Sequence, residues 1–264
     1  MRFLFSSILF SFVLALSAPV MAAEKIGVIL MHGKWGTNKG KSPVVILGKA
    51  LSSAGMIVLT PDMPWSKSKL YSKDYEETMN RIDGLVSSLK SKGATKIVVG
   101  GHSMGANAAL GYGARRDGIA AILAIAPGHV PESASWAGKF AADVAKARKL
   151  VDAGKGDKKE KFSDINQGKK KTLNIPARVY LSWFAPDGPS PMPMNAANLK
   201  AGTALLWVTG NKDGLHQREG EAYAFAKAPP NPKSAYVVVS SGHGDAPKKS
   251  KKEIIQLQIG RAHV

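Results

Sequence analysis

The segment that most constrains the fold is KIVVGGHSMGAN, in which a run of strand character leads into the pattern Gly-x-Ser-x-Gly centred on Ser103. Turning from a strand into a helix at a single residue forces Ser103 into a strained backbone conformation, for which we expect a positive φ. It also leaves no room for side chains two residues away, and Gly101 and Gly105 meet that requirement. The pattern therefore predicts a sharp turn that presents the Ser103 hydroxyl at the carboxyl end of a sheet, with the N–H of Met104 aimed at the same point.

Apolar runs that alternate with helical patterns surround this turn and indicate the fold class. Uninterrupted apolar runs are typical of strands buried on both faces of a parallel sheet. They occupy residues 26–31, 56–60, 96–99, 119–125, 204–208 and 236–239. Helical spacing and capping residues favour helices over residues 43–54, 74–92, 106–114 and 221–227, with another beginning near residue 251. The alternation predicts one α/β domain over residues 23–258, built on a doubly wound, mainly parallel sheet of about six strands.

The regular alternation breaks between residues 131 and 202, which we interpret as an insertion. A helix is expected first, because apolar side chains recur at helical spacing along one face. They are Trp136, Phe140, Val144, Ala147 and Val151. A basic stretch rich in Gly, Lys and Asp follows, then an apolar run at residues 179–184 that is predicted to form a strand, then a proline-rich segment at residues 186–193. An insertion of this kind next to a candidate site predicts a lid or partial cap.

The two ends of the chain carry signals that concern processing rather than folding. Met1-Arg2, an apolar run over residues 3–16 and small residues up to Ala22 form the three regions of a secretory signal peptide at residues 1–22. We expect cleavage near Ala22/Ala23 and a periplasmic or secreted protein; the competing interpretation is an uncleaved membrane anchor. Without cysteine, such a protein relies on its core instead of disulfides. Residues 259–264, IGRAHV, match what the start of a common sequencing adapter would encode, so we expect the natural sequence to end near Gln258.

The strongly basic composition of the chain bears on which binding partners are expected. Lysine and arginine number 37 against 19 aspartates and glutamates, which gives a formal net charge of +18. The excess gathers in runs at residues 155–161, 169–171 and 248–252. Electrostatic contact with an anionic envelope surface is one interpretation, and a lysine-rich solvated surface is the other, since no aromatic side chains interleave with the runs. Nucleic-acid binding is disfavoured by the predicted export and the lack of a binding motif, and the sequence contains no motif for a metal or another cofactor.

A serine nucleophile needs a base to accept its proton and a third group to orient that base. His243 and Asp213 are the strongest candidates, because each follows a late strand and so lies at the edge of the sheet where the Ser103 turn emerges. The alternatives are His129 and His216 as the base, and Asp187 and Asp245 as the acid. Of the remaining histidines, His32 is interpreted as a loop anchor and His102 as a packing residue beside the turn.

These motifs resemble the α/β hydrolases of the esterase or lipase type over nearly all of the mature chain. The matching pieces are His32-Gly33 after the first strand, residues 101–105 as the nucleophile elbow, Gly210-x-x-Asp213 after a late strand, and His243 after the last. The resemblance implies Ser103 as nucleophile, Asp213 as orienting acid and His243 as general base. It also implies an oxyanion hole formed by the backbone N–H groups of Met104 and of either Lys34 or Trp35. The chain departs from the family pattern by lacking its usual first two strands.

The implied function is hydrolysis of a carboxylic ester or related acyl bond by an exported serine hydrolase, acting through an acyl-enzyme on a small-molecule or lipid-like acyl substrate. Two alternatives stay open: a non-catalytic, basic envelope-binding protein on the same fold, and an α/β hydrolase that acts on a thioester, lactone or amide. Four aromatic residues are candidates to line the substrate pocket, with core packing as an equally good interpretation. They are Trp35, Trp136, Trp183 and Phe184.

Overall fold

A computed structural model describes residues 24–256 of the protein. The expected signal peptide at residues 1–22 and the adapter-like residues 259–264 lie outside the described residues. Between residues 24 and 256, no helix is both long enough and apolar enough to cross a lipid bilayer.

A six-stranded sheet forms the centre of the molecule, in the order β2-β1-β3-β4-β7-β8, and each pair of neighbouring strands is parallel. The strands are β1 (Ile26–Met31), β2 (Ile57–Leu59), β3 (Lys96–Ser103), β4 (Ala121–Pro127), β7 (Ala204–Gly210) and β8 (Ala235–Val239). β1, β4 and β7 are buried along their whole length, as expected for strands covered on both faces. β3 pairs with β1 on one side and β4 on the other, so the turn at Ser103 emerges in the interior of the sheet. This topology confirms the predicted doubly wound, parallel sheet.

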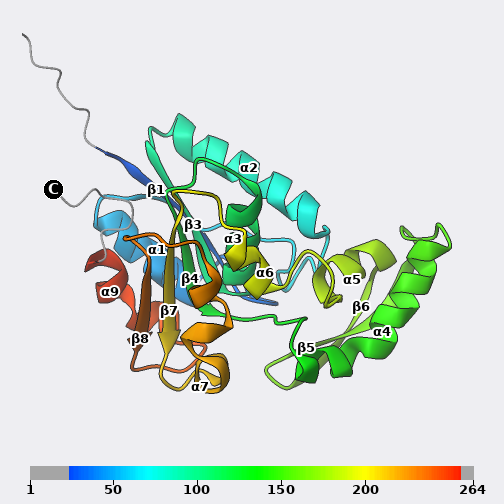
Figure 1. Ribbon diagram of the computed structural model, residues 1–264. Coiled ribbons are helices and arrows are strands. Elements are labelled where there is room, and N and C mark those ends of the chain that lie inside the picture. The colour runs from blue at the N-terminus through cyan, green and yellow to red at the C-terminus, as the bar shows by residue number, and fades with distance from the viewer. Residues whose placement is uncertain (1–23, 257–264) are drawn as a thin grey trace, which may run out of the picture.

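Helices cover both faces of the sheet (Figure 1). One face is covered by α1 (Pro43–Ser53), α8 (Ala246–Lys249) and α9 (Lys251–Gln256), and the other by α2 (Tyr75–Ser91) and α3 (Met104–Arg115). The N-terminus of α2 has the predicted capping box, in which the Asp74 carboxylate accepts from the Glu77 N–H and the Glu77 carboxylate accepts from the Asp74 N–H. Small residues let α3 pack tightly, because most of its alanines and glycines are buried between the sheet and α2.

The helix predicted over residues 221–227 is wrong in position. The structure has a shorter helix, α7 (Gly214–Glu219), followed by two 3-10 turns at Glu221–Tyr223 and Phe225–Lys227. Gly220 separates them, because its φ of 59° and ψ of −148° cannot belong to a continuous helix.

Residues 131–202, here called the inserted segment, lie between β4 and β7 and stand beside the sheet (Figure 1). Its elements are α4 (Ala134–Asp152), β5 (Lys159–Asn166), β6 (Lys169–Pro176), α5 (Ala177–Phe184) and α6 (Met192–Ala197). The strand predicted at residues 179–184 is therefore wrong, since these residues form most of α5. The apolar run fits either period, and in the helix Tyr180, Trp183 and Phe184 share one buried face.

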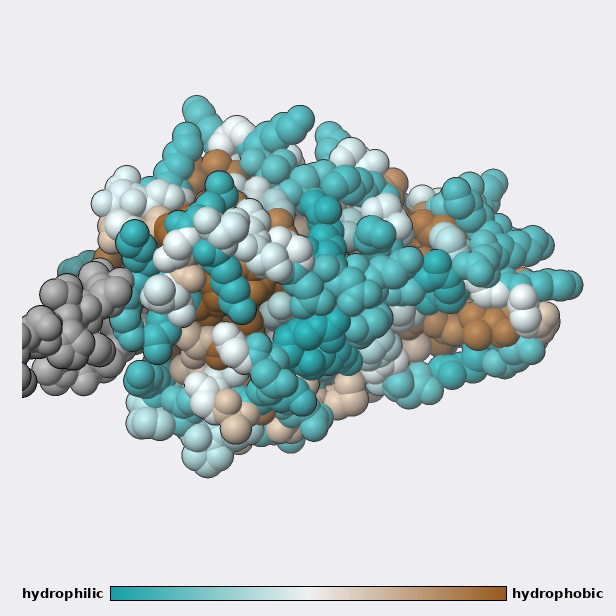
Figure 2. Space-filling view, turned by 90° about the horizontal axis from the view of Figure 1, so that it is seen from above, coloured by the Kyte–Doolittle hydropathy of each residue, from teal (hydrophilic) through white to brown (hydrophobic). Residues whose placement is uncertain are grey.

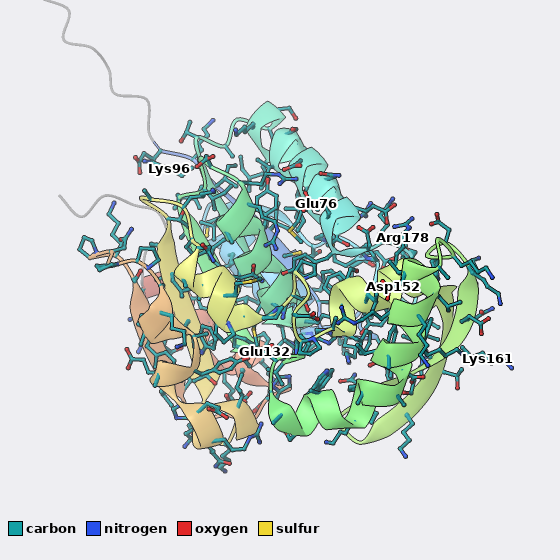
Figure 3. The ribbon with its side chains drawn as sticks, turned by 45° about the vertical axis from the view of Figure 1, so that its right-hand side comes forward. Glu76, Lys96, Glu132, Asp152, Lys161 and Arg178 are labelled. Atoms are coloured by element: carbon teal, nitrogen blue, oxygen red, sulfur yellow. The ribbon has the colours of Figure 1, made fainter. Side chains whose placement is uncertain are left out.

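The lysine-rich stretch forms an antiparallel β5–β6 hairpin that the sequence pattern did not predict. Phe162 and Leu173 face each other across the two strands and are buried, whereas the neighbouring lysines are exposed. One of these, Lys161, lies at the outer edge of the molecule in Figure 3. Gln167 and Gly168, at the turn, both have positive φ, as two-residue turns of type I′ require.

The inserted segment is fastened to the sheet domain by packing and by charge. Phe140, Tyr180 and Trp183 belong to the same hydrophobic core as the inward faces of α2 and α3. Arg178, at the start of α5 (Figure 3), contacts the carboxylate of Asp74, the N-cap of α2, through its guanidinium. Because this ion pair is partly exposed, it contributes about 0–1 kcal/mol, and the shared apolar core supplies most of the attachment.

The exterior reflects the basic composition. The face shown in Figure 2 is mostly hydrophilic, and apolar side chains show in small areas between polar ones. Among the described residues, the large hydrophobic side chains that stay exposed are Val151, Met194 and Val238.

Candidate active site

The turn at Ser103 has the strained geometry expected from its sequence. Ser103 has a φ of 56° and a ψ of −117°, and α3 begins at the next residue, Met104. A side chain at Gly101 would come within 2.6 Å of the Met31 carbonyl oxygen, and one at Gly105 would collide with the same atom. The two glycines therefore allow the turn to pack directly against the end of β1.

Three side chains from three loops form a hydrogen-bonded chain at this edge of the sheet. Nε2 of His243 lies 3.0 Å from Ser103 Oγ, and Nδ1 of His243 lies 2.7 Å from Asp213 Oδ2. Asp213 follows β7 and His243 follows β8. Because the ionised Asp213 carboxylate can only accept a hydrogen bond, Nδ1 of His243 carries the hydrogen and donates it, which leaves Nε2 free to accept a proton from the serine hydroxyl. His243 thus lies within hydrogen-bonding distance of both the candidate nucleophile and the candidate acid.

Asp213 is in the charge state that this arrangement needs. Only 2% of its surface is exposed. Burial alone would raise the pKa of Asp213, but the hydrogen bond and charge of His243 and the backbone N–H of Leu215, 2.8 Å from Oδ1, outweigh it and hold the pKa below its ordinary value. The carboxylate is therefore ionised at neutral pH, where it can stabilise an imidazolium at His243.

His102, inside the Gly-x-Ser-x-Gly pattern, supports the loop that carries His243. Its Nε2–H donates to the backbone carbonyl of His243 at 2.7 Å, and the two ring centroids are 5.1 Å apart. Burial lowers the pKa of His102 to about 4, and the charge of His243 acts in the same direction. The ring is therefore neutral at neutral pH, with its proton held on Nε2 by the carbonyl that it contacts.

The loop after β1 brings a free backbone N–H next to the turn. Gly33 packs against Ser103, since a methyl group at Gly33 would lie 3.1 Å from Ser103 Cβ. The Gly33 carbonyl oxygen accepts from the Gly36 N–H at 3.0 Å and from Nδ1 of His32 at 2.9 Å. The Lys34 N–H belongs to the same trans peptide unit, points the opposite way and has no acceptor among residues 24–256.

Met104 offers a second N–H, because the first N–H groups of a helix have no acceptor within it. Both Met104 and Lys34 line the cavity that contains Ser103. The alternative donor, Trp35, is excluded by geometry: its N–H donates to the Trp65 carbonyl at 3.0 Å. The anchoring role expected of His32 fits its contacts, since its Nε2 also accepts from the Met63 N–H at 3.1 Å.

A cavity of about 420 Å³ opens at Ser103 and separates the sheet from the inserted segment. Of the four aromatic residues considered for the pocket, Trp136 of α4 lines this cavity. Trp183 and Phe184 are fully buried in the core instead, and Trp35 turns its indole N–H toward Asp164 at 2.9 Å. For these three residues, packing and structural hydrogen bonds are the roles that the structure supports.

The alternative bases have other partners. Nε2 of His129 donates to the Trp183 carbonyl at 2.6 Å, and burial holds the pKa of His129 well below its ordinary value. His216 lies beside Tyr236, with Nδ1 at 2.9 Å from the phenol oxygen. Neither imidazole makes a hydrogen bond to Ser103 in the described part of the chain.

The alternative acids are likewise engaged elsewhere. Asp187 pairs with Arg148 at 2.7 Å on the surface of the inserted segment, and Asp245 accepts from the Gly242 N–H at 2.8 Å. Between residues 24 and 256, no cluster of three or more histidine, aspartate or glutamate side chains is placed to hold a metal ion.

Three residues that line the cavity or contact a residue lining it were not identified from the sequence. Gly128 lies against the candidate nucleophile, since a methyl group there would lie 2.8 Å from Ser103 Oγ. Its place directly after an apolar run that ends at the same edge of the sheet could have indicated that it lies at the site. Asp164 contacts Lys34 across 130 positions of sequence, so no local pattern could reveal it. Asn166 begins an Asn-x-Gly turn, which is a recognisable hairpin signal.

Comparison with known proteins agrees with this fold. The profile of the Alpha/beta hydrolase family matches residues 28–249, and no curated protein gives a significant sequence match. Similar solved structures include a monoacylglycerol lipase from Paleococcus ferrophilus, at 20% identity and a TM-score of 0.63, covering 89% of this chain and 95% of that chain. A thermostable carboxyl esterase from Bacillus coagulans in complex with glycerol gives 14% identity and a TM-score of 0.62, with 92% and 91% covered.

Est1E from Butyrivibrio proteoclasticus, with ferulic acid bound, gives 18% identity and a TM-score of 0.60, with 92% of each chain covered. At such identities the structural likeness concerns the fold, and the family profile extends from β1 to α8. The chain belongs to the alpha/beta hydrolase family.

Proposed function

We propose that the protein is a serine hydrolase that cleaves a carboxylic ester or a related acyl bond through a covalent acyl-enzyme at Ser103. The observation that carries this proposal is the hydrogen-bonded chain from Asp213 through His243 to Ser103, with contacts of 2.7 and 3.0 Å. A serine hydroxyl is a weak nucleophile by itself, and an adjacent, oriented base is what activates it.

In the first half-reaction, Ser103 Oγ attacks the carbonyl carbon of the substrate while Nε2 of His243 takes the hydroxyl proton. The electron pair of the C=O bond moves to the carbonyl oxygen, where the N–H groups of Met104 and Lys34 stabilise the negative charge. The ionised Asp213 stabilises the imidazolium. The bond from the acyl carbon to the leaving oxygen then breaks, and His243 returns its proton to that oxygen, which leaves as an alcohol.

In the second half-reaction, a water molecule attacks the acyl carbon and gives one proton to Nε2 of His243. The bond between the acyl carbon and Ser103 Oγ breaks, and His243 returns the proton to the serine. The product is a carboxylic acid, and the protein regains its starting protonation state.

A small-molecule or lipid-like ester is the substrate class that the cavity supports best. The cavity volume of about 420 Å³ suits such a ligand. The cavity walls are partly apolar, with side chains from Val130, Trp136, Ile165 and Leu215. Two similar structures are named a monoacylglycerol lipase and a carboxyl esterase, which favours an ester. Thioesters, lactones and amides present the same electrophilic carbon, and relative kcat/KM on a matched acyl series distinguishes them.

We also propose that the protein is exported and that its positive charge favours contact with anionic envelope surfaces. The sequence of residues 1–22 and the net charge of +18 support this. N-terminal sequencing after expression in a bacterium should find a chain that begins at Ala23; a chain that keeps Met1 would contradict cleavage, and its presence in the cytoplasmic fraction would contradict export. Binding to anionic vesicles should weaken as salt is raised.

A fluorophosphonate probe tests the proposed reaction directly. The purified protein should be labelled, with the adduct mapped to Ser103 by mass spectrometry. Ser103→Ala should abolish labelling, while Ser91→Ala, at an exposed serine of α2, should keep it. A correctly folded protein whose Ser103 stays unmodified would exclude the enzyme and leave the non-catalytic binding protein as the better account.

A further inference from the structure

We propose that the β5–β6 hairpin of the inserted segment positions the oxyanion hole, with Asp164 and Asn166 as the positioning residues. This inference rests on the proposed function, because it concerns how the Lys34 N–H is held beside Ser103. It gives the inserted segment a part in the chemistry, in addition to covering the cavity.

The peptide unit between Lys34 and Trp35 is held at both ends. Its carbonyl oxygen, from Lys34, accepts a hydrogen bond from Nδ2 of Asn166 at 3.1 Å. Its N–H, from Trp35, donates to the Trp65 carbonyl at 3.0 Å. The Lys34 N–H lies in the preceding peptide unit, joined to this one at the Lys34 Cα. Because the held unit fixes the Lys34 Cα, to which that N–H is joined through the backbone nitrogen, a displacement of the held unit would move the N–H relative to Ser103.

Asp164 holds the side chain of the same residue. Its Oδ1 accepts from Nζ of Lys34 at 2.6 Å, and its Oδ2 accepts from the indole N–H of Trp35 at 2.9 Å and the phenol of Tyr71 at 3.1 Å. Asp164 has no exposed surface, and a buried carboxylate is stable only with donors of this number and kind. One carboxylate thereby ties together the hairpin, the loop after β1 and the loop before α2.

The Lys34 ammonium is enclosed on its remaining sides. It donates to the Ile165 carbonyl at 3.1 Å and lies 4.5 Å from the ring centroid of Trp136. Burial lowers the pKa of Lys34, and the charge of Asp164 opposes that shift. Separating the hairpin from the core would break this ion pair and the hydrogen bonds of the same carboxylate, so these contacts hold the hairpin against the loop after β1.

The need for such a clamp follows from the chemistry of the oxyanion. Donors in an oxyanion hole stabilise the transition state because they already point at the developing charge and need no reorganisation. On one side of Lys34, Gly36 and His32 hold the Gly33 carbonyl; on the other side, Asn166 holds the Lys34 carbonyl, so core and hairpin together fix the position of this residue. A displacement of about 1 Å in such a site costs roughly 100-fold in rate.

Asn166→Ala tests the clamp, with Asn174→Ala as its matched control. Asn174 lies on the same hairpin but is exposed on β6. With active sites counted by complete fluorophosphonate titration, Asn166→Ala should lower kcat about 10- to 100-fold with little change in KM. It should weaken the binding of a trifluoromethyl ketone inhibitor by the same factor, because the hemiketal oxygen of the bound inhibitor occupies the oxyanion hole. Asn166→Asp, which has the same size but cannot donate, should behave like Asn166→Ala, and Asn174→Ala like the wild type.

Asp164→Asn is the stronger perturbation, because it leaves the Lys34 ammonium without a counter-charge. Folded Asp164→Asn protein should lose at least as much kcat as Asn166→Ala; if it does not fold, the Asn166 variants decide. An unlabelled wild type would contradict the proposed function. A labelled, active wild type with Asn166→Ala equal to Asn174→Ala would overturn the positioning role alone, as would equal losses of affinity for the ketone and for the carboxylic acid product.

Discussion

Asp213 and Asp164 are both buried carboxylates beside the cavity, one in the sheet domain and one in the inserted segment. Asp213 accepts from His243, an imidazole whose other nitrogen faces Ser103. Asp164 accepts from Lys34, Trp35 and Tyr71, whose N–H and O–H groups stay protonated at neutral pH. The proposed function assigns the two carboxylates different roles because their partners differ. An imidazole that faces the cavity makes Asp213 part of the proposed proton relay, whereas ammonium, indole and phenol donors make Asp164 the proposed structural clamp.

Of the substitutions that test this contrast, Asp213→Asn should cause the largest loss of activity. The amide keeps the size of the side chain but would favour the wrong tautomer of His243, so kcat should fall about 10³- to 10⁴-fold with the unfolding free energy little changed. Asp187→Asn, at an exposed aspartate paired with Arg148, should leave kcat unchanged. Steady-state ester hydrolysis measures both. If the two variants were equally active, Asp213 would have no place in a relay.

Asp164→Ala should show the opposite profile, with its main effect on stability. Removing one partner of a buried ion pair costs about 3–5 kcal/mol, because the other charge stays buried without compensation. Asp157→Ala, which breaks the exposed contact with Arg178, should cost about 0–1 kcal/mol. Denaturant unfolding measures both. A loss at Asp164 no larger than that at Asp157 would break the contrast between relay and clamp.

Gly128→Ala tests the sheet-domain wall of the cavity, next to Ser103. A methyl group there would lie 2.8 Å from Ser103 Oγ and 3.4 Å from His243 Cε1, so the nucleophile must shift and kcat/KM should fall about 100-fold. Gly138→Ala, on α4 with open space around it, should keep full activity and raise the unfolding free energy by about 1 kcal/mol. Full activity in Gly128→Ala would show that Ser103 does not need its observed position.

His102, in the sheet domain, should make the stability of the protein depend on pH, and this is the smallest of the expected effects. Its folded pKa of about 4 lies below the value of 6.5 expected for the unfolded chain. Between these values the unfolded chain binds a proton that the folded protein does not, so stability falls as pH drops from 6.5 to 4, by about 2 kcal/mol from this group. The loss should be smaller in His102→Gln, as measured by urea unfolding at several pH values. An identical pH dependence in both proteins would contradict the burial of a neutral imidazole.

The same two regions differ in how far the sequence predicts them. In the sheet domain, each strand is an uninterrupted apolar run and the start of α2 carries its own capping box, so local pattern and fold agree. Ser103, Asp213 and His243 lie at or just after the carboxyl ends of parallel strands, which all meet at one edge of the sheet. The proximity of these three residues could therefore be inferred from the sequence alone.

In the inserted segment, the predicted helix at residues 136–151 is confirmed by α4, but the elements after it were not predicted, for three physical reasons. Residues 179–184 are apolar and too short for their period to be read, and α5 formed because that run could bury one helical face. Lysines on β5 and β6 conceal the alternation of Phe162 and Asp164, since lysine is depleted in strands. The contact between Lys34 and Asp164 depends on tertiary packing, which leaves no periodic trace in the sequence.

The most direct test of the account is intact-mass and peptide-level mass spectrometry of the protein quenched with acid during turnover of an activated ester. We predict an adduct with the mass of the acyl group less one hydrogen, located on Ser103 and absent in Ser103→Ala. Hydrolysis that proceeds without any such adduct, or with the adduct on another residue, would contradict the claim that Ser103 is the nucleophile.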